Sequence, residues 1–288
     1  MSVSEHRDDP GAPGSDEAVL YQVRDSGVAV LTFNRPERMN AWGQGLSTGF
    51  YACIERAEAD PAVRVIVVTG KGRAFCAGAD MGNLDSISAT TVESAGKTDI
   101  SALVAAKHPY FLTQLSKPVI VAINGSVAGM GLSQALFADI RFAAAGAKFS
   151  TSFARRGLIA EYGISWILPR LIGWARAVEL LLSGRTFLAE EAAELGLLTR
   201  VLPAEELMPT VLGYADEMAR NCSPTSLAVM KQQLYADAAI GMVETSVKAE
   251  ALMHDSMRRT DFIEGITAFF QKRPPNFATS SNSPSRSS

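Results

Sequence analysis

Short apolar runs alternate with longer segments of helical periodicity along most of the chain. Four runs rich in β-branched residues predict buried strands: GVAVLTFN (27–34), RVIVVTG (64–70), PVIVAIN (118–124) and LLTRVLP (197–203). Apolar residues recur at helical spacing over 44–59, 101–116, 129–138, 173–183 and 189–195. Strands separated by helices favour right-handed crossovers and a mainly parallel, buried sheet. The sequence therefore predicts an α/β fold for its first two thirds.

The last third has a different pattern. Helical periodicity continues from 205 to 271 almost without a strand signal. We expect residues 17–204 to form the α/β core and residues 205–277 to form a helical region. That region either covers its own core or meets a partner subunit, and periodicity alone does not separate the two. Residues 1–16 are rich in Asp, Gly, Pro and Ser, and residues 278–288 are rich in Ser, which predicts two disordered tails.

Charge and cysteine content narrow the possible partners. The 288 residues include 27 Lys and Arg against 30 Asp and Glu, so no broad basic surface is available for nucleic acid. Three cysteines without metal-ligand spacing indicate reduced thiols and no zinc site. No basic leader with an apolar core opens the chain, and no run approaches the roughly 20 apolar residues of a membrane span. These features predict a cytoplasmic protein.

Two predicted strands are followed by glycine-rich loops, KGRAFCAGADMGN (71–83) and GSVAGMGLSQALFADI (125–140). Glycines there let backbone N–H groups approach a ligand, and the second loop runs into an apolar helix whose first N–H groups are free. Two such donors could bind one oxygen. Neither loop matches the dinucleotide pattern G-x-G-x-x-G or a Walker A loop. The alternative is that the glycines only permit tight turns and close packing.

Several segments together resemble one known family. They are NRPERMNA (34–41), DPAVRVIVVTGKGRAFCAGAD (60–80), KPVIVAINGSVAGMGLSQALFADIRFAA (117–144), AEEAAELGLL (189–198) and FFQKRPPNF (269–277). In this order they resemble the crotonase, or enoyl-CoA hydratase/isomerase, superfamily over about 20–277. The resemblance implies a spiral of ββα turns with a C-terminal helical trimerisation region. It also implies a homotrimer or dimer of trimers.

The resemblance implies a substrate as well. Members bind acyl-CoA thioesters, so coenzyme A enters as part of the substrate and no separate cofactor is expected. By position, the backbone N–H groups that hold the thioester oxygen belong to Ala79 and Met130. Their neighbours Ala77, Gly78, Asp80 and Gly129 are then substrate-binding residues. Met130 replaces a glycine common in the family, which keeps the N–H group but adds bulk beside the thioester.

The acidic residues depart from the family pattern. Hydratases of the superfamily resemble one another in using two glutamates, and the corresponding positions here are Ser133 and Phe153. A two-glutamate hydration is therefore not readable in this chain. Glu161 stands where dienoyl-CoA isomerases and hydroxyacyl-CoA hydrolases of the superfamily carry an acidic residue.

Glu161 sits in an apolar stretch, GLIAEYGISW (157–166). Desolvation among its apolar neighbours is expected to raise its pKa and suit it to general acid/base catalysis. These neighbours are Ile159, Tyr162, Ile164 and Trp166. The alternative is an ion pair with Arg155, Arg156 or Arg170.

Other polar residues are weaker candidates. Tyr162 and Ser133 could position water or substrate, but either is more often a pocket or core residue. A nucleophilic Ser133 would need a histidine, and none lies near it in sequence. His108 is expected at a helix surface or lining the pocket. By resemblance, Arg38 and the basic pair of Lys272 with Arg273 meet the CoA phosphates, the pair reaching a neighbouring subunit's ligand; the alternative is that they are solvated surface charges.

Two functional classes remain open. The first is an enzyme of acyl-CoA metabolism in which Glu161 moves a proton or activates water. Hydration is the family's most frequent activity, and double-bond isomerisation and hydrolysis are its rivals. The second class is a non-catalytic acyl-CoA-binding scaffold. The direction of Glu161 discriminates between them, since a carboxylate facing the pocket favours catalysis and one paired with arginine favours the scaffold.

Overall fold

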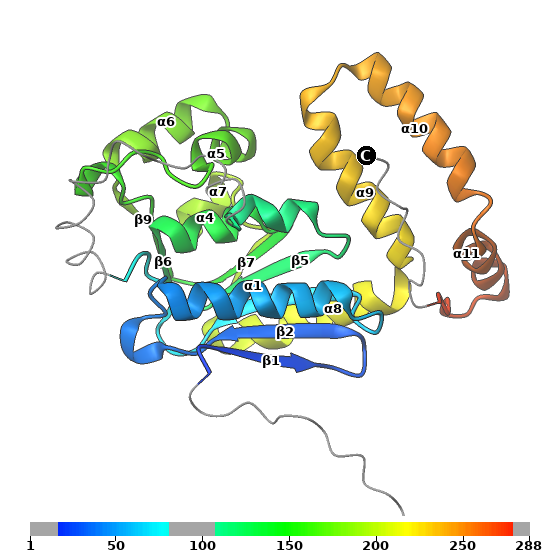
Figure 1. The fold of residues 1–288 in the computed structure, drawn as a ribbon, viewed down its shortest axis with the longest axis horizontal. Helices are drawn as coiled ribbons and strands as arrows, with labels where there is room; N and C mark the ends of the chain where they lie inside the picture. Colours follow the sequence, from blue (N-terminus) through cyan, green and yellow to red (C-terminus); the bar gives the residue numbers. More distant parts are fainter. Residues whose placement is uncertain (1–16, 81–106, 279–288) are drawn as a thin grey trace, which may run out of the picture.

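The larger of two sheets forms the middle of the molecule (Figure 1). The computed structural model describes residues 17–80 and 107–278. The strands of this sheet lie in the order β1 (Val19–Val23), β2 (Val28–Phe33), β3 (Val65–Gly70), β5 (Val119–Ile123), β7 (Ile140–Ala144) and β10 (Arg200–Leu202). β1 is antiparallel to β2, and the neighbouring pairs from β2 to β10 are parallel. The predicted α/β class with a mainly parallel sheet is confirmed.

The smaller sheet carries the loops of interest. Its strands lie in the order β4 (Ala74–Cys76), β6 (Ser126–Ala128), β8 (Lys148–Ser150) and β9 (Thr186–Leu188). β4, β6 and β8 are parallel, and β9 is antiparallel to β8. The chain passes from β3 to β4, from β5 to β6 and from β7 to β8, so each turn adds one strand to each sheet. This is the ββα spiral that the resemblance implied.

Helices cover both faces of the larger sheet. Alternation along β3 sends Ile66 and Val68 into the core beneath α1 (Gln44–Ala59), while Val65 and Val67 pack with α8 (Ala204–Asn221) on the other face. The remaining core helices are α4 (Gly129–Phe137), α5 (Ile164–Ile172), α6 (Trp174–Ser183) and α7 (Ala189–Glu194). Short 3-10 helices occupy Pro36–Arg38, Pro109–Gln114, Ala154–Arg156 and Asp237–Ala239.

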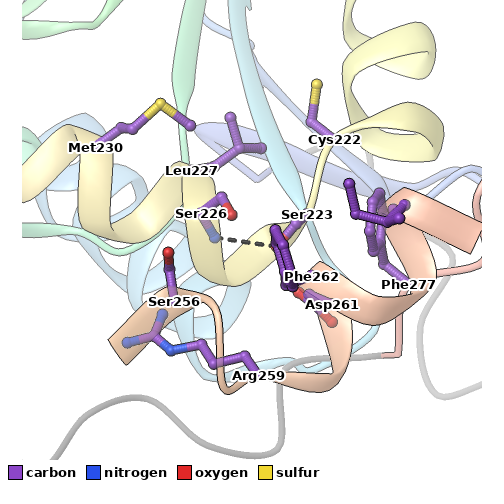
Figure 2. A pocket seen from close by; sticks show the side chains of 12 residues that line it. Cys222, Ser223, Ser226, Leu227, Met230, Ser256, Arg259, Asp261, Phe262 and Phe277 are labelled. Atoms are coloured by element: carbon purple, nitrogen blue, oxygen red, sulfur yellow. Dashed lines mark hydrogen bonds between the residues drawn. The ribbon is translucent and has the colours of Figure 1, made fainter. Parts of the chain in front are cut away.

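The last helices project away from the sheets (Figure 1). We call residues 224–271 the C-terminal arm, which holds α9 (Pro224–Ala236), α10 (Met242–Ser256) and α11 (Thr260–Gln271). A groove of about 370 Å³ lies within it, lined among others by Leu227, Met230, Phe262 and Phe277 (Figure 2). Because α8 packs on the sheet, it belongs to the core by its contacts, although the helical pattern begins at 205. An oligomerisation role for the arm stays a prediction.

Several elements differ from the sequence prediction. The expected helix over 101–116 is reduced to the 3-10 turn at Pro109–Gln114, where a proline opens the segment, and residues 101–106 lie outside the described residues. The strand signal at 197–203 shortens to β10. β4, β6, β8 and β9 were missed because three residues are too few for a period-2 pattern. The tails predicted at 1–16 and 279–288 also lie outside the described ranges.

No helix in the described part of the chain is both long and apolar enough to cross a membrane. The runs that predicted strands are short, and each is covered by helices on its apolar faces.

Candidate active site

A cavity of about 580 Å³ opens where β4, β6 and β8 end. Its walls come from three parts of the chain: the start of α1, the two glycine-rich loops, and the segment between β8 and α5. The lining residues are Trp42, Gly43, Ser47, Ala77, Gly78, Ala79, Asp80, Ala128, Gly129, Met130, Thr151, Ser152, Phe153, Arg156, Leu158, Glu161 and Tyr162. Ligands bind at such carboxyl ends of parallel strands in many α/β proteins.

The two glycine-rich loops touch one another at this edge. β4 and β6 pair in parallel, with Cys76 opposite Val127, so both loops leave the sheet on the same side. Gly78 has φ +99°, and a Cβ on it would lie 3.2 Å from the carbonyl oxygen of Ala128. Gly129 has φ +49°, and a Cβ there would lie 3.8 Å from Cα of Gly78. Glycine is therefore required at 78 by both conformation and space.

Ala79 presents its N–H group on the side away from Trp42. The two residues form a parallel bridge in which Trp42 N donates to Gly78 O at 2.6 Å and Asp80 N donates to Trp42 O at 3.0 Å. In such a bridge the N–H of the middle residue points away from the partner strand. Ala79 also lines the cavity.

Met130 supplies a second donor from the first turn of α4. Ala128 is the N-cap of this helix, and the first N–H groups of a helix have no acceptor within it. The positive end of the helix dipole lies at the same place. Met130 also lines the cavity. Two backbone donors from different loops therefore border one hollow.

Gly131 has a packing role instead. A Cβ on Gly131 would lie 2.5 Å from the carbonyl oxygen of Cys76 and 2.6 Å from its Cβ, so only glycine lets α4 approach β4 this closely. Cys76 is buried beneath it, and burial raises the pKa of this thiol to about 12. The packing interpretation of the glycines thus holds at this position.

Glu161 faces the cavity from the loop that precedes α5. It is half-buried, and desolvation raises the pKa of its carboxyl group. Within residues 17–80 and 107–278 its side chain has no ion-pair partner, because the three candidate arginines bind elsewhere. Arg155, Arg156 and Arg170 donate to the carbonyl oxygens of Ser183, Ser152 and Trp166, respectively.

The expected surroundings of Glu161 are partly wrong. Ile159, Ile164 and Trp166 do not belong to the cavity lining, and Ile159 is 78% exposed. Of the four expected neighbours Tyr162 lines the cavity with Glu161, and Leu158, which was not expected, lines it as well. Tyr162 has φ +56°, and desolvation, followed by the nearby Glu161 charge, raises its pKa.

Phe153 and Ser133 stand at the positions that resemble the two glutamates of hydratases, and they lie in different surroundings. Phe153 is buried in the cavity wall and carries no proton to transfer. Ser133 is fully buried inside α4, where its hydroxyl donates to Gly129 O at 3.3 Å. It does not belong to the cavity lining, so the possibility that it positions water or substrate is not supported.

Asp80 is the other carboxylate of the cavity wall, and it is paired. Arg38 Nη1 lies 3.2 Å from Asp80 Oδ2, and Arg35 Nη1 lies 3.9 Å from the same oxygen. Arg38 thus reaches the rim of the cavity through Asp80, although it is not a lining residue. The pairing with Arg35 was missed because nothing in the sequence relates these two loops.

Lys272 lies far from the cavity of its own protomer. It is the C-cap residue of α11, with φ +52°, and α11 lies well away from α4 (Figure 1). Its neighbour Arg273 pairs with Glu264 at 2.6 Å. His108 does not line the cavity, but its ring lies 6.5 Å from that of Tyr162 and stacks on Tyr110.

Sequence reasoning missed several lining residues, notably Trp42, Thr151, Ser152 and Arg156. Only Trp42 had a signal, since it directly follows the NRPERMNA segment. The described residues contain no group of three or more His, Cys, Asp or Glu side chains that could hold a metal ion. Two backbone N–H groups beside a carboxylate without an ion-pair partner in the described residues could bind an oxyanion and transfer a proton.

Known proteins share this sequence and fold. The profile of the enoyl-CoA hydratase/isomerase family matches residues 23–280. The chain is 36% identical to a 1,2-epoxyphenylacetyl-CoA isomerase of Escherichia coli over 91% of this chain and 98% of that protein. It is 34% identical to a probable enoyl-CoA hydratase of Rhodobacter capsulatus, with the same two coverages.

Solved structures agree. An enoyl-CoA hydratase from Mycobacterium marinum, EchA12_1, is 57% identical with a TM-score of 0.66, covering 78% of this chain and 100% of that one. A probable enoyl-CoA hydratase/isomerase from Mycobacterium abscessus is 34% identical with a TM-score of 0.80, covering 90% and 98%. From its sequence and its fold, this chain belongs to the enoyl-CoA hydratase/isomerase family, the crotonase superfamily.

Proposed function

We propose that the chain moves a double bond within an enoyl-CoA thioester, with Glu161 as its single proton-transferring carboxylate. The observation that carries this proposal is the cavity-facing Glu161, whose pKa is raised by desolvation and which has no ion pair in the described residues. A raised pKa brings a carboxylate nearer to the working pH, which favours general acid/base catalysis. The N–H groups of Ala79 and Met130 would stabilise the negative charge on the thioester oxygen.

The proposed reaction balances with one catalytic group. Glu161 removes a proton from Cα of a 3-enoyl thioester, and the electrons of that bond form a dienolate whose charge rests on the thioester oxygen. The protonated Glu161 then gives its proton to Cγ, and the double bond moves into conjugation with the carbonyl. The carboxylate is regenerated, and no water is consumed.

The second candidate is hydration of a 2-enoyl thioester. It is favoured by the hydratase names of the relatives from Rhodobacter capsulatus and Mycobacterium marinum. Hydration adds a hydroxyl group to Cβ and a proton to Cα. With Ser133 outside the cavity and Asp80 held by two arginines, Glu161 would have to activate the water and deliver the proton in turn. Isomerisation asks less of a single carboxylate, so we place it first.

Absorbance of the conjugated enoyl thioester separates the two reactions. We would follow 3-hexenoyl-CoA, which gains this absorbance on isomerisation, and crotonyl-CoA, which loses it on hydration. Wild type should show the gain, and Glu161→Gln should lower the rate by about 10²- to 10⁴-fold, the usual contribution of a general acid/base. Glu205→Gln is the matched control, because Glu205 is exposed at the start of α8.

Each other outcome has a defined meaning. Loss of crotonyl-CoA absorbance without any gain on 3-hexenoyl-CoA would replace isomerisation by hydration. Release of free CoA thiol that depends on Glu161 would indicate an acyl-CoA hydrolase. Acyl-CoA binding without turnover of any of these substrates would indicate a non-catalytic scaffold. Any of these three results would overturn the proposal.

We also propose that basic side chains contact the CoA phosphates. Arg38 is supported by its place at the cavity rim, 56% exposed in its side chain beyond the contact with Asp80. Lys272 lies too far from the cavity of its own protomer to serve it, so its proposed contact requires a neighbouring subunit. The KM for acyl-CoA of Arg38→Ala, compared with that of Lys272→Ala, tests both assignments.

A further inference from the structure

Two aromatic residues line the cavity, each next to one of the two loops that carry the backbone donors. Trp42 lines the cavity and forms the backbone bridge with Ala79, so it is fixed next to the first donor. Phe153 lines the cavity beside the second loop, where its Cε1 would lie 4.0 Å from a Cβ on Gly129. A ligand whose oxygen reaches both N–H groups would therefore lie close to these two residues.

The Trp42 ring is held in place by other rings. It meets Phe33, Phe50 and Tyr51 edge to face, with centroid distances of 6.0, 5.6 and 6.2 Å. Its backbone is fixed as well, since its N–H and C=O groups both bond to the Gly78–Asp80 segment. A wall fixed in this way loses little conformational entropy when a ligand packs on it.

Phe153 is equally well fixed. It is only 5% exposed and packs in the same core as Leu168 and Ile164. Tyr162 adds a further aromatic side chain to the same wall of the cavity, beside Glu161. Three aromatic residues therefore line the cavity that holds the two donors, together with polar side chains such as Glu161 and Arg156.

We propose that the preferred substrates are acyl-CoA thioesters whose acyl group carries an aromatic ring within its first few carbons. This rests on the proposed function in one respect, that the thioester oxygen lies at Ala79 and Met130. Aromatic rings gain from edge-to-face and offset contacts with other rings beyond the area that they bury. A saturated ring or a linear chain of the same size fills the space without that gain.

Binding of two matched thioesters tests the preference apart from any turnover. 3-Phenylpropanoyl-CoA and 3-cyclohexylpropanoyl-CoA have the same number of carbon atoms, and neither contains the double bond that the proposed reaction moves. Calorimetric titration of wild type should give a Kd about 2- to 12-fold lower for the phenyl compound, the range expected of one aromatic contact.

Variants assign the preference to the two rings. The ratio used here is the Kd of the cyclohexyl compound divided by that of the phenyl compound. Trp42→Leu and Phe153→Leu should each reduce this ratio towards one. Trp42→Phe keeps a ring and should retain most of the ratio, and it covers the case in which Trp42→Leu fails to fold. Tyr214→Leu is the control, because Tyr214 lies on α8 across the larger sheet, against Phe142.

The outcomes separate this inference from the proposed function. A wild-type ratio of one or below overturns the aromatic preference even if Glu161 proves catalytic, and so does a ratio unchanged in both leucine variants. An aromatic preference in a protein that turns over no enoyl-CoA supports the inference while the proposed reaction fails. Failure to bind either thioester overturns both.

Discussion

At residue scale, Glu161 is a carboxylate kept partly out of water without a compensating cation in the described chain. Such a placement costs stability, because burial disfavours the ionised form. Asp80, in the same cavity, shows the opposite solution, with Arg38 3.2 Å and Arg35 3.9 Å away. The two carboxylates of this cavity thus differ in their availability for proton transfer, because their neighbours differ.

The raised pKa of Glu161 predicts opposite effects on activity and stability. A base must be ionised, so kcat/KM should fall as the pH drops through a pKa above 4.5, the usual value of a glutamate. Because folding raises this pKa, the group favours the folded state below its unfolded pKa and loses that contribution as the pH rises through the folded pKa. Glu161→Gln should therefore have a higher Tm than wild type at pH 7.

Thermal melts of wild type and Glu161→Gln across pH test this sign. The Tm advantage of Glu161→Gln over wild type should shrink as the pH falls below about 4, because the Glu161 carboxyl group is then neutral in both the folded and the unfolded state. Glu205 is exposed, so Glu205→Gln should show no such pH-dependent difference in Tm from wild type. A variant that melts below wild type at pH 7 would mean that Glu161 is stabilised by its surroundings and is not a strained base.

At element scale, the start of α4 unites glycine geometry with free backbone donors. Gly129 has positive φ, Met130 follows in the first turn, and Gly131 lets the helix pack against Cys76.

The second element that matters is α9, which ties the C-terminal arm to the core. Lys231 of α9 donates to Asp139 Oδ2 at 2.7 Å and to Lys117 O at 2.9 Å.

Removing the Met130 N–H should impair catalysis without removing any side-chain contact of Glu161. Met130→Pro deletes this donor within the first helical turn, where it has no intrahelical acceptor. Loss of one oxyanion donor costs typically about 10²- to 10³-fold in kcat. Met130→Leu keeps the N–H and should stay within a few-fold of wild type. Equal kcat values for the two variants would rule out this donor, provided that both melt cooperatively.

The buried ion pair of α9 predicts an asymmetric response to mutation. Lys231 is 5% exposed in its side chain and Asp139 is 17% exposed. Asp139 also accepts from Tyr235 OH at 3.0 Å and Val119 N at 2.7 Å, so it keeps two donors when Lys231 is lost. Lys231 without Asp139 would keep only the Lys117 carbonyl oxygen among the contacts described here.

We therefore expect Asp139→Asn to destabilise the fold by about 3–5 kcal/mol, the usual cost of leaving a buried charge unpaired. Lys231→Met should cost clearly less, because methionine fills the space and Asp139 keeps its other donors. Urea unfolding of both variants measures the difference. The reverse order would show that the carboxylate, and not the ammonium group, depends on the pair.

At the scale of the whole molecule, the C-terminal arm carries several large apolar residues that are exposed to solvent. Side chains 62–82% exposed on α10 and α11 are Met242, Val243, Val247, Ile263, Phe269 and Phe270. Large apolar residues exposed in this number on two consecutive helices favour protein–protein contacts. The exposed apolar residues of the arm therefore support the expectation of a homotrimer or dimer of trimers.

Disrupting the exposed aromatic pair of α11 should lower the oligomeric state. Phe269 and Phe270 are each 77% exposed, and their rings lie 5.8 Å apart. In light scattering after gel filtration, wild type should have a mass of three or six times 30.7 kDa. The double variant Phe269→Ser, Phe270→Ser should shift towards the monomer, whereas Tyr214→Ser on α8 should not. A monomeric wild type would refute the assembly.

The sequence by itself determined the features that depend on neighbouring residues along the chain. β-branched runs predicted β2, β3 and β5, and the glycines of the two loops predicted backbone donors near one ligand. The positive φ of Gly78 and Gly129 and the start of α4 are local properties, set by a few consecutive residues, whereas the contact of the donors with a ligand stays a prediction.

Only the tertiary structure decided which side chains share the cavity. It turned Ser133 into α4, set Asp80 against Arg35 and Arg38, and left Glu161 unpaired among the described residues. It also brought Trp42 to Ala79. The contacts of Asp80 with Arg35 and Arg38, and of Trp42 with Ala79, join segments that are distant in sequence. Periodicity cannot reveal such contacts, because it reports which face a residue occupies and not what lies opposite.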